Sequence, residues 1–562
     1  MVELDTDILI IGAGMSGLGL AVQLIRNYNY RDFQIVEKVA DVGGTWLVNT
    51  YPGCGCDVAS HFYSYSFELK SDWSQKFSMR EEIQDYFRGV AEKYAVLPHV
   101  SFNTTVERAE WNEEGQFWET TLRDRGSKEV YTKRSRILVS GVGNLSVPRE
   151  CELPGADEYQ GKLFHSALWD HSFDWKDKDV VVLGNGCSAT QFVPVMAEDA
   201  KSITQFARQA QYLAERPNPV YSPAFKALMT YMPFAMRLYR FKLYADMEKD
   251  FASMDTEGGA HIRQGLVEEN ERYVKRMAPE KYWSALIPKH EIGCKRKVMD
   301  TNYLSSLHRP NVELIASDPV TNLTASGVIT ASGRELPADA IVLATGFQVF
   351  RMLFPMQIHG RNSLNLQSYW DEQHQGAAQA YFGTCIPGFP NFFTLMGPNT
   401  VTGHLSVIYT VECQINFILR LLDPLLQSKL KKPTLSIKTI LASPPTAAPN
   451  VVAVLPSAAL RDSSWLQSGL SKLVWSSGCT NWALDPATGM NIAMYPGYQF
   501  SFWLRSIFIP GGDFEFVDGK GQKSELRVGA WRVLRKAGGV VAAGVVGCGL
   551  GWWWGGGSWG VC

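Results

Sequence analysis

Residues 7–17 read Asp-Ile-Leu-Ile-Ile-Gly-Ala-Gly-Met-Ser-Gly, a short apolar run that leads into a glycine-rich turn. The apolar run predicts a buried strand of a parallel sheet. Gly12, Gly14 and Gly17 allow a tight turn and a close approach of the backbone to a pyrophosphate. A helix that begins near Met15 would offer free N–H groups to the phosphates. The stretch therefore predicts a Rossmann-like domain that binds a dinucleotide.

The next strand supports this interpretation. Phe33–Glu37 follows an apolar helix, and Glu37 lies 20 residues after Gly17. A carboxylate at this distance can accept hydrogen bonds from the ribose hydroxyls of a dinucleotide. The alternative for Glu37 is a solvated residue at a strand end.

A second motif of the same kind occurs at Gly184-Asn-Gly186-Cys-Ser-Ala189, directly after the apolar run Asp179–Leu183. Alanine replaces the third glycine, which suits a slightly looser packing of helix on strand. The next predicted strand, Ser202–Arg208, ends in a cation instead of a carboxylate. Because a guanidinium pairs well with a 2′-phosphate, Arg208 favours NADPH over NADH. An ordinary surface arginine is the alternative.

The segment between the two motifs, Tyr159–Asp170, reads YQGKLFHSALWD. It resembles the fingerprint of the flavin-dependent Baeyer–Villiger monooxygenases, and the fungal members that act in secondary metabolism look most similar. The fixed positions are Tyr159, Gly161, His165, Trp169 and Asp170. In that family the segment joins the two nucleotide domains. We therefore expect His165 to be a hinge or an interdomain hydrogen-bonding residue rather than a general base.

The resemblance implies a set of cofactor contacts. For FAD it implies Gly12, Gly14, Met15, Ser16, Gly17, Glu37, Gly44, Thr45, Trp46, Asp57, Val58, Tyr63, Val106 and Asn399. For NADPH it implies Gly55, Cys56, Asp57, Gly184, Asn185, Gly186, Cys187, Ser188, Ala189, Thr190, Ala207, Arg208, Lys295 and Arg296. The chain departs from many members of the family at Gly55, where an arginine or a small residue is common, so any role of that side chain is lost.

The resemblance also implies the reaction. NADPH reduces FAD, O2 adds to give a C4a-peroxyflavin, and a ketone becomes an ester or lactone; a polyketide-like ketone is the expected substrate. Arg296 would stabilise the negative charge on oxygen, and Asp57 would hold its guanidinium in place. The alternatives are a related enzyme that oxygenates nitrogen or sulfur, and an NADPH-dependent flavoprotein reductase.

The expected fold class is α/β, with two Rossmann-like dinucleotide-binding domains and a helical insertion. Each domain is predicted to be built from two parts of the chain. The expected order is FAD domain 1–150, NADP domain 151–215, helical insertion 216–284, NADP domain 285–337, FAD domain 338–430, C-terminal region 431–530 and Gly/Trp-rich tail 531–562.

Composition excludes some classes of function. The 54 Lys and Arg residues nearly balance the 56 Asp and Glu residues, so no global field favours nucleic acid. Ten Cys residues in 562 form no dense disulfide framework, and with no signal peptide we expect a reducing, cytoplasmic setting. Zinc-like spacing of His and Cys does not occur, so we predict no metal.

Three further segments remain outside the motifs. Phe234, Leu238, Phe241 and Ala245 recur at helical spacing, and we expect them in the core more than in a substrate lid. Residues 442–460 are rich in Pro and Ala, which favours a poorly ordered loop. After Lys536 the chain carries no charge, with ten Gly and four Trp. This tail is either a membrane anchor or a disordered or aberrant segment.

Overall fold

The computed structural model describes residues 3–427, 449–479 and 481–524. The Gly/Trp-rich tail and residues 442–448 of the Pro/Ala-rich segment lie outside this part of the chain. Among the described residues, no helix has the length and hydropathy needed to cross a membrane.

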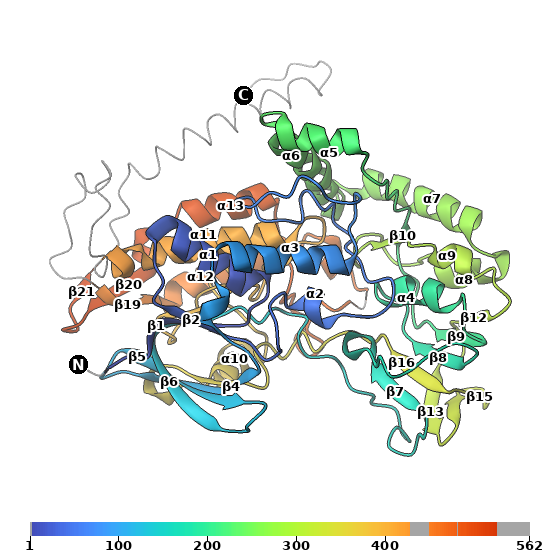
Figure 1. Ribbon diagram of the computed structural model, residues 1–562, viewed down its shortest axis with the longest axis horizontal. Helices are drawn as coiled ribbons and strands as arrows, with labels where there is room; N and C mark the ends of the chain where they lie inside the picture. Colours follow the sequence, from blue (N-terminus) through green and yellow to red (C-terminus); the bar gives the residue numbers. More distant parts are fainter. Residues whose placement is uncertain (1–2, 428–448, 480, 525–562) are drawn as a thin grey trace.

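Two sheets form the frame of the molecule (Figure 1). The first has the order β17-β4-β5-β6-β1-β2-β3, and β18 pairs with β6. Its central strand β1 pairs in parallel with β2 and β6, as the buried apolar run predicted. The strands are β1 (Thr6–Ile11), β2 (Phe33–Val36), β3 (Val100–Ser101), β4 (Thr104–Asn112), β5 (Phe117–Asp124), β6 (Val130–Ser140), β17 (Gln357–His359) and β18 (Phe392–Thr394).

The second sheet has the order β12-β9-β8-β16-β7 and is parallel throughout. Its strands are β7 (Lys162–His165), β8 (Asp179–Leu183), β9 (Ser202–Phe206), β12 (Val312–Ile315) and β16 (Ala340–Leu343). The prediction that the chain re-enters the first domain at residue 338 is wrong. Because β16 lies between β7 and β8, the chain leaves this second sheet only after Leu343.

Helices cover both sheets. After the glycine turns come α1 (Met15–Tyr28) and α4 (Ala189–Met196), and α3 (Arg80–Lys93) follows later in the first domain. The long helix α11 (Val407–Gln427) packs on α1 and on α13 (Gln499–Ile507). Shorter helices are α2 (Thr45–Val48), α9 (Tyr303–Ser306) and α10 (Leu366–His374).

The helical insertion is present. It comprises α5 (Pro223–Tyr231), α6 (Ala235–Glu248), η3 (Lys249–Met254), α7 (Ala260–Met277) and α8 (Trp283–Leu286). The prediction that its apolar stripe is core is wrong. The exposed fractions of Phe234, Leu238 and Phe241 are 74%, 67% and 40%. The helix instead turns Leu243 inward.

The C-terminal region folds against the first sheet. It contains β19 (Pro449–Val454), α12 (Pro456–Leu470), α13, β20 (Phe514–Asp518) and β21 (Lys523–Ser524), and β19, β20 and β21 form a small antiparallel sheet. The predicted loop over 442–460 is therefore wrong for residues 449–460. The run Asn450–Leu455 is β-branched and apolar enough to be a buried strand, and Pro456 suits the first turn of a helix.

A buried histidine fixes the insertion to the first domain. The His61 ring has an exposed fraction of 1% and lies against the rings of Tyr221, Phe225 and Tyr239. Burial lowers the pKa of His61 from 6.5 to about 4. The imidazole is therefore neutral over the ordinary pH range.

We predict a pH-dependent stability from His61. Between about pH 6.5 and 4 the unfolded chain binds a proton that the folded chain does not, so stability falls as the pH falls. Relative to the His61→Phe variant, the wild-type chain should lose about 2 kcal/mol more on going from about pH 7.5 to pH 5. Thermal unfolding of both proteins at the two pH values measures this difference. Equal losses would contradict the prediction.

Candidate active site

A bidentate ion pair joins two distant parts of the chain at the centre of the candidate site. Arg296 donates from Nε to Asp57 Oδ2 at 3.0 Å and from Nη2 to Oδ1 and Oδ2 at 2.9 and 2.7 Å. Asp57 lies in the loop after α2, and Arg296 precedes β11 (Val298–Met299). The Asp57 carboxylate raises the pKa of Arg296, so the guanidinium stays charged. The structure thus brings together the two residues predicted for catalysis.

The first glycine turn is packed as a dinucleotide site requires. A Cβ on Gly17 would lie 2.0 Å from the carbonyl oxygen of Gly12, so only glycine allows α1 to sit this close to β1. Gly14 touches Gly44 of the following loop, where a Cβ would lie 2.9 Å from the Gly14 Cα. The first turn of α1 has no side-chain cap and no acidic residue. Its N–H groups are therefore available to phosphates.

Aromatic residues predicted for FAD gather beside this turn. Trp46 on α2 is buried, and its indole N–H donates to Tyr63 Oη at 3.1 Å. Tyr63 in turn lies against the Met15 sulfur, at 3.9 Å. These three residues come from three elements and meet at one place. Ser16 and Gly17 lie on α1, Thr45 begins α2, and Val58 is buried next to Asp57.

Glu37 has structural partners in addition to its predicted role. Its carboxylate accepts the backbone N–H of Ala13 at 2.7 Å and that of Val39 at 3.0 Å. Each oxygen keeps a further lone pair for a ribose hydroxyl. Val106 lies on β4 close by, since the N–H of Thr104 donates to the Glu37 carbonyl. The side chain therefore fixes the glycine turn whether or not a nucleotide is bound.

The second glycine turn leaves open space for a ligand. Gly184 has φ +117°, and a Cβ there would lie 2.4 Å from Ala344 O. A Cβ on Gly186 would meet nothing within 4 Å. Asn185 donates to the Gln209 carbonyl at 2.8 Å and so holds the turn in place. Cys187, Ser188, Ala189 and Thr190 lead into α4, and Ala207 is buried after β9.

Sequence reasoning missed a side chain that joins the two glycine-motif domains. Gln191 on α4 accepts from the N–H of Gly55 at 3.3 Å and donates to the Gly55 carbonyl at 3.0 Å. Tyr51 also donates to Gln191, at 3.0 Å. Beside Gly55, the Arg216 guanidinium donates to the carbonyl of Cys56 at 2.8 Å. The Arg216 charge therefore lies close to Gly55, 3.6 Å from where a Cβ would stand.

Two cations predicted to bind NADPH, Arg208 and Lys295, lie close to each other beyond the end of β9. Arg208 is exposed just after β9, and its charge acts on Lys295. Burial first, and then the Arg208 charge, lower the pKa of Lys295. Lys295 donates to Gln209 Oε1, which keeps it on this edge of the sheet. An anion between two such cations would relieve their repulsion.

The residues at the fixed positions of the fingerprint segment make structural contacts. Tyr159 donates to the Ala338 carbonyl at 2.8 Å, and Gly161 leaves room for the Tyr159 hydroxyl. The Trp169 ring lies edge-on to the Phe164 ring and beside Phe192 of α4. Hydrogen bonds from Ser172 and Lys162 lower the pKa of Asp170 to about 2. The segment thereby braces β7 against α4.

His165 ends β7 and is not placed as a general base. Its Nδ1 accepts the N–H of Ala167 at 3.0 Å, so Nδ1 carries no proton in this arrangement. Burial lowers the pKa of the ring, which lies against Phe347 in the segment that leaves the second sheet. These contacts place His165 at a junction of the chain, and its role as a hinge stays a prediction.

Asn399 is engaged by the C-terminal region. Its amide donates to the carbonyl of Asn491 at 2.6 Å and to that of Met494 at 3.1 Å. Both amide hydrogens are thereby used, so the side chain offers FAD only its oxygen. The loop 397–406 that carries Asn399 is in this way tied to residues 491–494.

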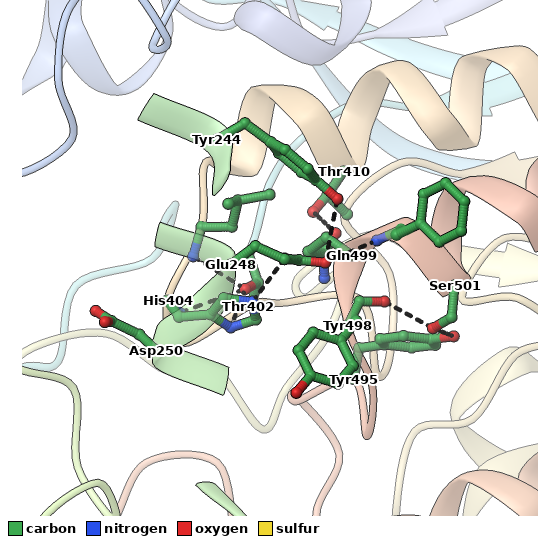
Figure 2. Close-up of polar contacts among 12 residues, drawn as sticks. Tyr244, Glu248, Asp250, Thr402, His404, Thr410, Tyr495, Tyr498, Gln499 and Ser501 are labelled. Atoms are coloured by element: carbon green, nitrogen blue, oxygen red, sulfur yellow. Dashed lines mark hydrogen bonds and ion pairs between the residues drawn. The ribbon is translucent and has the colours of Figure 1, made fainter. Parts of the chain in front are cut away.

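A carboxylate hub connects the insertion to that loop (Figure 2). Glu248, the last residue of α6, accepts from Tyr244 Oη at 3.2 Å and from the Phe500 N–H at 3.0 Å. Its other oxygen lies 3.1 Å from His404 Nε2. The His404 and Glu248 side chains have exposed fractions of 3% and 12%. Three segments far apart in the sequence therefore meet at one carboxylate.

The hydrogen-bond pattern fixes the tautomer of His404. Thr402 Oγ1 accepts the N–H groups of His404 at 3.3 Å and of Leu405 at 3.1 Å, so both of its lone pairs are used. Its own hydrogen then points to His404 Nδ1, 3.0 Å away. With Nδ1 as acceptor, a neutral ring carries its hydrogen on Nε2 and donates it to Glu248.

A disulfide that composition did not predict lies next to the ion pair. Cys294, two residues before Arg296, is bonded to Cys479. The segment that carries Cys479 also packs on the candidate site: Val474 is close to Gly293, and a Cβ on Gly403 would lie 2.5 Å from the Trp475 ring. No spacing motif identifies this pair, because the cysteines are 185 residues apart.

Comparisons with known proteins identify flavoprotein monooxygenases that are similar to this chain. A sequence profile of flavin-binding monooxygenase-like proteins matches residues 5–360. A Baeyer–Villiger monooxygenase of Pseudomonas aeruginosa is 34% identical over 88% of both chains. The FAD-binding monooxygenase ktnD of Aspergillus niger is 35% identical over 77% of this chain and 71% of its own. A closed crystal structure of cyclohexanone monooxygenase superposes with a TM-score of 0.77 at 22% identity, covering 91% of this chain and 99% of that one.

The paired glycine turns and the sequence profile define the class of protein. The chain belongs to the flavin-binding monooxygenase-like family. Within it, the similar relatives include proteins named Baeyer–Villiger monooxygenases from Pseudomonas aeruginosa and from Streptomyces coelicolor. The resemblance stated from the fingerprint is thereby confirmed, and so is the α/β fold with two Rossmann-like domains.

We predict that Arg208 sets a preference for NADPH. Arg208→Ala should weaken the interaction with NADPH by about 1.5–3 kcal/mol, the contribution of a hydrogen bond to a charged group. The interaction with NADH should stay nearly unchanged. The measurement is kcat/KM for flavin reduction with each nicotinamide. Lys201→Ala is the matched control, because Lys201 lies just before the other end of β9 and pairs with Asp179. Equal kcat/KM values of the wild-type enzyme for NADH and NADPH would show that Arg208 does not set a preference.

We also predict that the hub is a major structural contact. Glu248→Ala leaves the Phe500 N–H and the His404 Nε2–H without an acceptor, which should lower the free energy of unfolding by about 2–4 kcal/mol. Glu248→Gln keeps an acceptor oxygen and should cost much less. The surface variant Glu271→Ala, which breaks an exposed pair with Lys275, should cost under about 1 kcal/mol. Denaturant unfolding of the three variants gives this ranking, and a harmless Glu248→Ala would contradict it.

Proposed function

We propose that this chain uses NADPH and O2 to insert one oxygen atom next to a ketone carbonyl, giving an ester or a lactone. The observation that carries the proposal is the Asp57–Arg296 ion pair in a chain with two dinucleotide-type glycine turns. Relatives that are 34% and 35% identical and bear the name Baeyer–Villiger monooxygenase support it. The enzyme is an FAD-dependent monooxygenase.

The residues present fit both cofactors. At the first turn, Gly14 and Gly44 leave a cradle that any Cβ would narrow, and the N-terminus of α1 is uncapped. At the second turn, Gly186 faces open space. We propose that the first site holds FAD through Gly12–Gly17, Glu37 and the Trp46–Tyr63 pair, and that the second holds NADPH through 184–190, Arg208 and Lys295. When bound and reduced, FAD supplies the activation of O2.

Arg296 has the properties that the oxygen-transfer step needs. Attack on a ketone carbonyl places negative charge on oxygen, which a fixed guanidinium stabilises. Arg296 cannot act as the acid that neutralises this charge, since Asp57 raises a pKa that is already high. Asp57 holds the planar guanidinium at two points, so it is oriented before the substrate arrives. We therefore propose Arg296 as the catalytic cation and Asp57 as its positioning partner.

Two fungal relatives support the proposed metabolic setting. The Aspergillus proteins ktnD and tazF are 35% and 31% identical to this chain and are named FAD-binding monooxygenases. We propose a role in secondary metabolism with a polyketide-like ketone. The test is incorporation of oxygen-18 from labelled O2 into the product, with a panel of cyclic and polyketide-like ketones, amines and sulfides. Labelled amine or sulfide oxides in place of labelled ester would overturn the proposal.

We predict that Arg296→Ala uncouples the reaction. The variant should still oxidise NADPH but release hydrogen peroxide instead of ester, with ester formation lowered about 10²–10³-fold. Product and peroxide formed per NADPH are the measurement. Lys297→Ala is the matched control, because Lys297 is the next residue and pairs with Asp250. Ester formation at the wild-type rate in Arg296→Ala would remove Arg296 from the mechanism.

A further inference from the structure

The turn between α5 and α6 exposes an unusual number of large apolar side chains. We call residues 228–241 the α5–α6 tip. The exposed fractions are 82% for Tyr231, 74% for Phe234, 67% for Leu238, 56% for Met232 and 45% for Leu228. Scattered apolar residues on a surface are ordinary, but five within eleven residues form a patch.

Helix α6 carries apolar side chains on both of its faces. Leu243, Tyr239 and Tyr244 pack inward on the core, where Tyr239 also bonds Tyr221 at 3.0 Å and Arg240 donates to Ser64 Oγ at 2.7 Å. Its outward face carries Phe234, Leu238 and Phe241, spaced by four and three residues. A surface helix of a globular protein normally turns polar side chains toward solvent. This outward face therefore has the composition of a surface that another phase covers.

The tip is held rigidly, so its exposure is not that of a loose loop. Ser222 caps α5 by accepting the Phe225 N–H at 3.2 Å, and Pro223 occupies the first turn. The Thr230 hydroxyl donates to Ser71 at 2.8 Å, which joins the end of α5 to the first domain. In Figure 1 the two helices form one edge of the molecule, away from both sheets. A flat surface can therefore reach them.

The charge of this segment indicates what would cover it. From 216 to 245 the sequence has no Asp or Glu but five cations. Arg216 and Arg240 point inward to Cys56 and His61. The other three, Lys226, Arg237 and Lys242, lie on the two helices of the tip, and Lys242 also pairs with Asp246 of the next turn. Arg237 borders a hollow of about 230 Å³ that is lined by Met232, Pro233 and Met236.

We propose that the α5–α6 tip is an interfacial membrane-docking surface for bilayers that carry anionic lipid headgroups. Apolar side chains beside cations are the combination that partitions into the headgroup region. A second copy of the chain fits less well, because a twofold contact would bring the three cations of one tip against those of the other. The proposal is independent of the proposed oxygenation reaction, since it concerns surface residues that are not placed in the cofactor sites.

The experiment is co-sedimentation of the full chain with vesicles of phosphatidylcholine alone and of equal parts phosphatidylcholine and phosphatidylserine. The wild-type protein should bind the anionic vesicles, and added salt should weaken binding. The double variant Phe234→Ser/Leu238→Ser should lower the partition constant at least about tenfold. Leu460→Ser is the matched control, because Leu460 is 62% exposed on α12, remote from the tip in sequence; it should bind as the wild type does.

Two further variants locate the contact. Lys226→Glu/Arg237→Glu should reduce binding to anionic vesicles more than to neutral ones. The fluorescence that Phe234→Trp adds to that of the 17 native Trp residues, taken as the difference from the wild type, should shift to shorter wavelength when anionic vesicles are added. Bound FAD, read from flavin absorbance, should be unchanged in all variants, which shows that they are folded.

Three outcomes would overturn the proposal. One is a wild-type chain that binds neither kind of vesicle. Another is a Phe234→Ser/Leu238→Ser variant that binds as the wild type does, which would assign binding to residues outside the tip. The third is concentration-dependent self-association of the wild type, lost in that variant, without vesicle binding. That result would make the tip an interface between copies of the chain.

Discussion

The Asp57–Arg296 ion pair is the contact on which the arrangement of the site depends. It joins residues 239 positions apart, one from the first domain and one from the loop that precedes β11. Two parallel N–H···O contacts define the orientation of both side chains, which a single contact between a lysine and a carboxylate would not do. Since removal of either partner would leave the other charge partly buried, the pair also links the stability of the two domains.

Other contacts support this pair from both sides. On one side Gln191 binds both backbone groups of Gly55, so the loop that carries Asp57 is tied to the helix that begins at the second glycine turn. On the other side the Cys294–Cys479 disulfide anchors the loop that carries Arg296. The Glu248 hub then joins the insertion to the loop after Gly397. Two cofactor sites on separate sheets can cooperate only if such contacts fix their relative position.

The insertion shows how one sequence pattern can have two structural meanings. Phe234, Leu238 and Phe241 have the spacing of a buried helical face, yet they face solvent. Periodicity reports only that one side of a helix is apolar, and the neighbouring surface decides whether that side is covered. Here the polar groups of His61 and Ser64 bind Arg240 and so turn the other side of α6 inward.

The sequence alone determined the two glycine turns with their strands and helices, because each is a local pattern with a local physical cause. The fingerprint segment and the predicted roles of Asp57 and Arg296 came instead from the resemblance to a known family. Tertiary structure decided the rest. The place of β16 in the second sheet, the strand at 449–454, the partners of Gln191 and Glu248 and the Cys294–Cys479 bond all depend on residues far away in the chain. Such contacts leave no periodic trace in sequence, since what a side chain meets is set by packing and not by its neighbours.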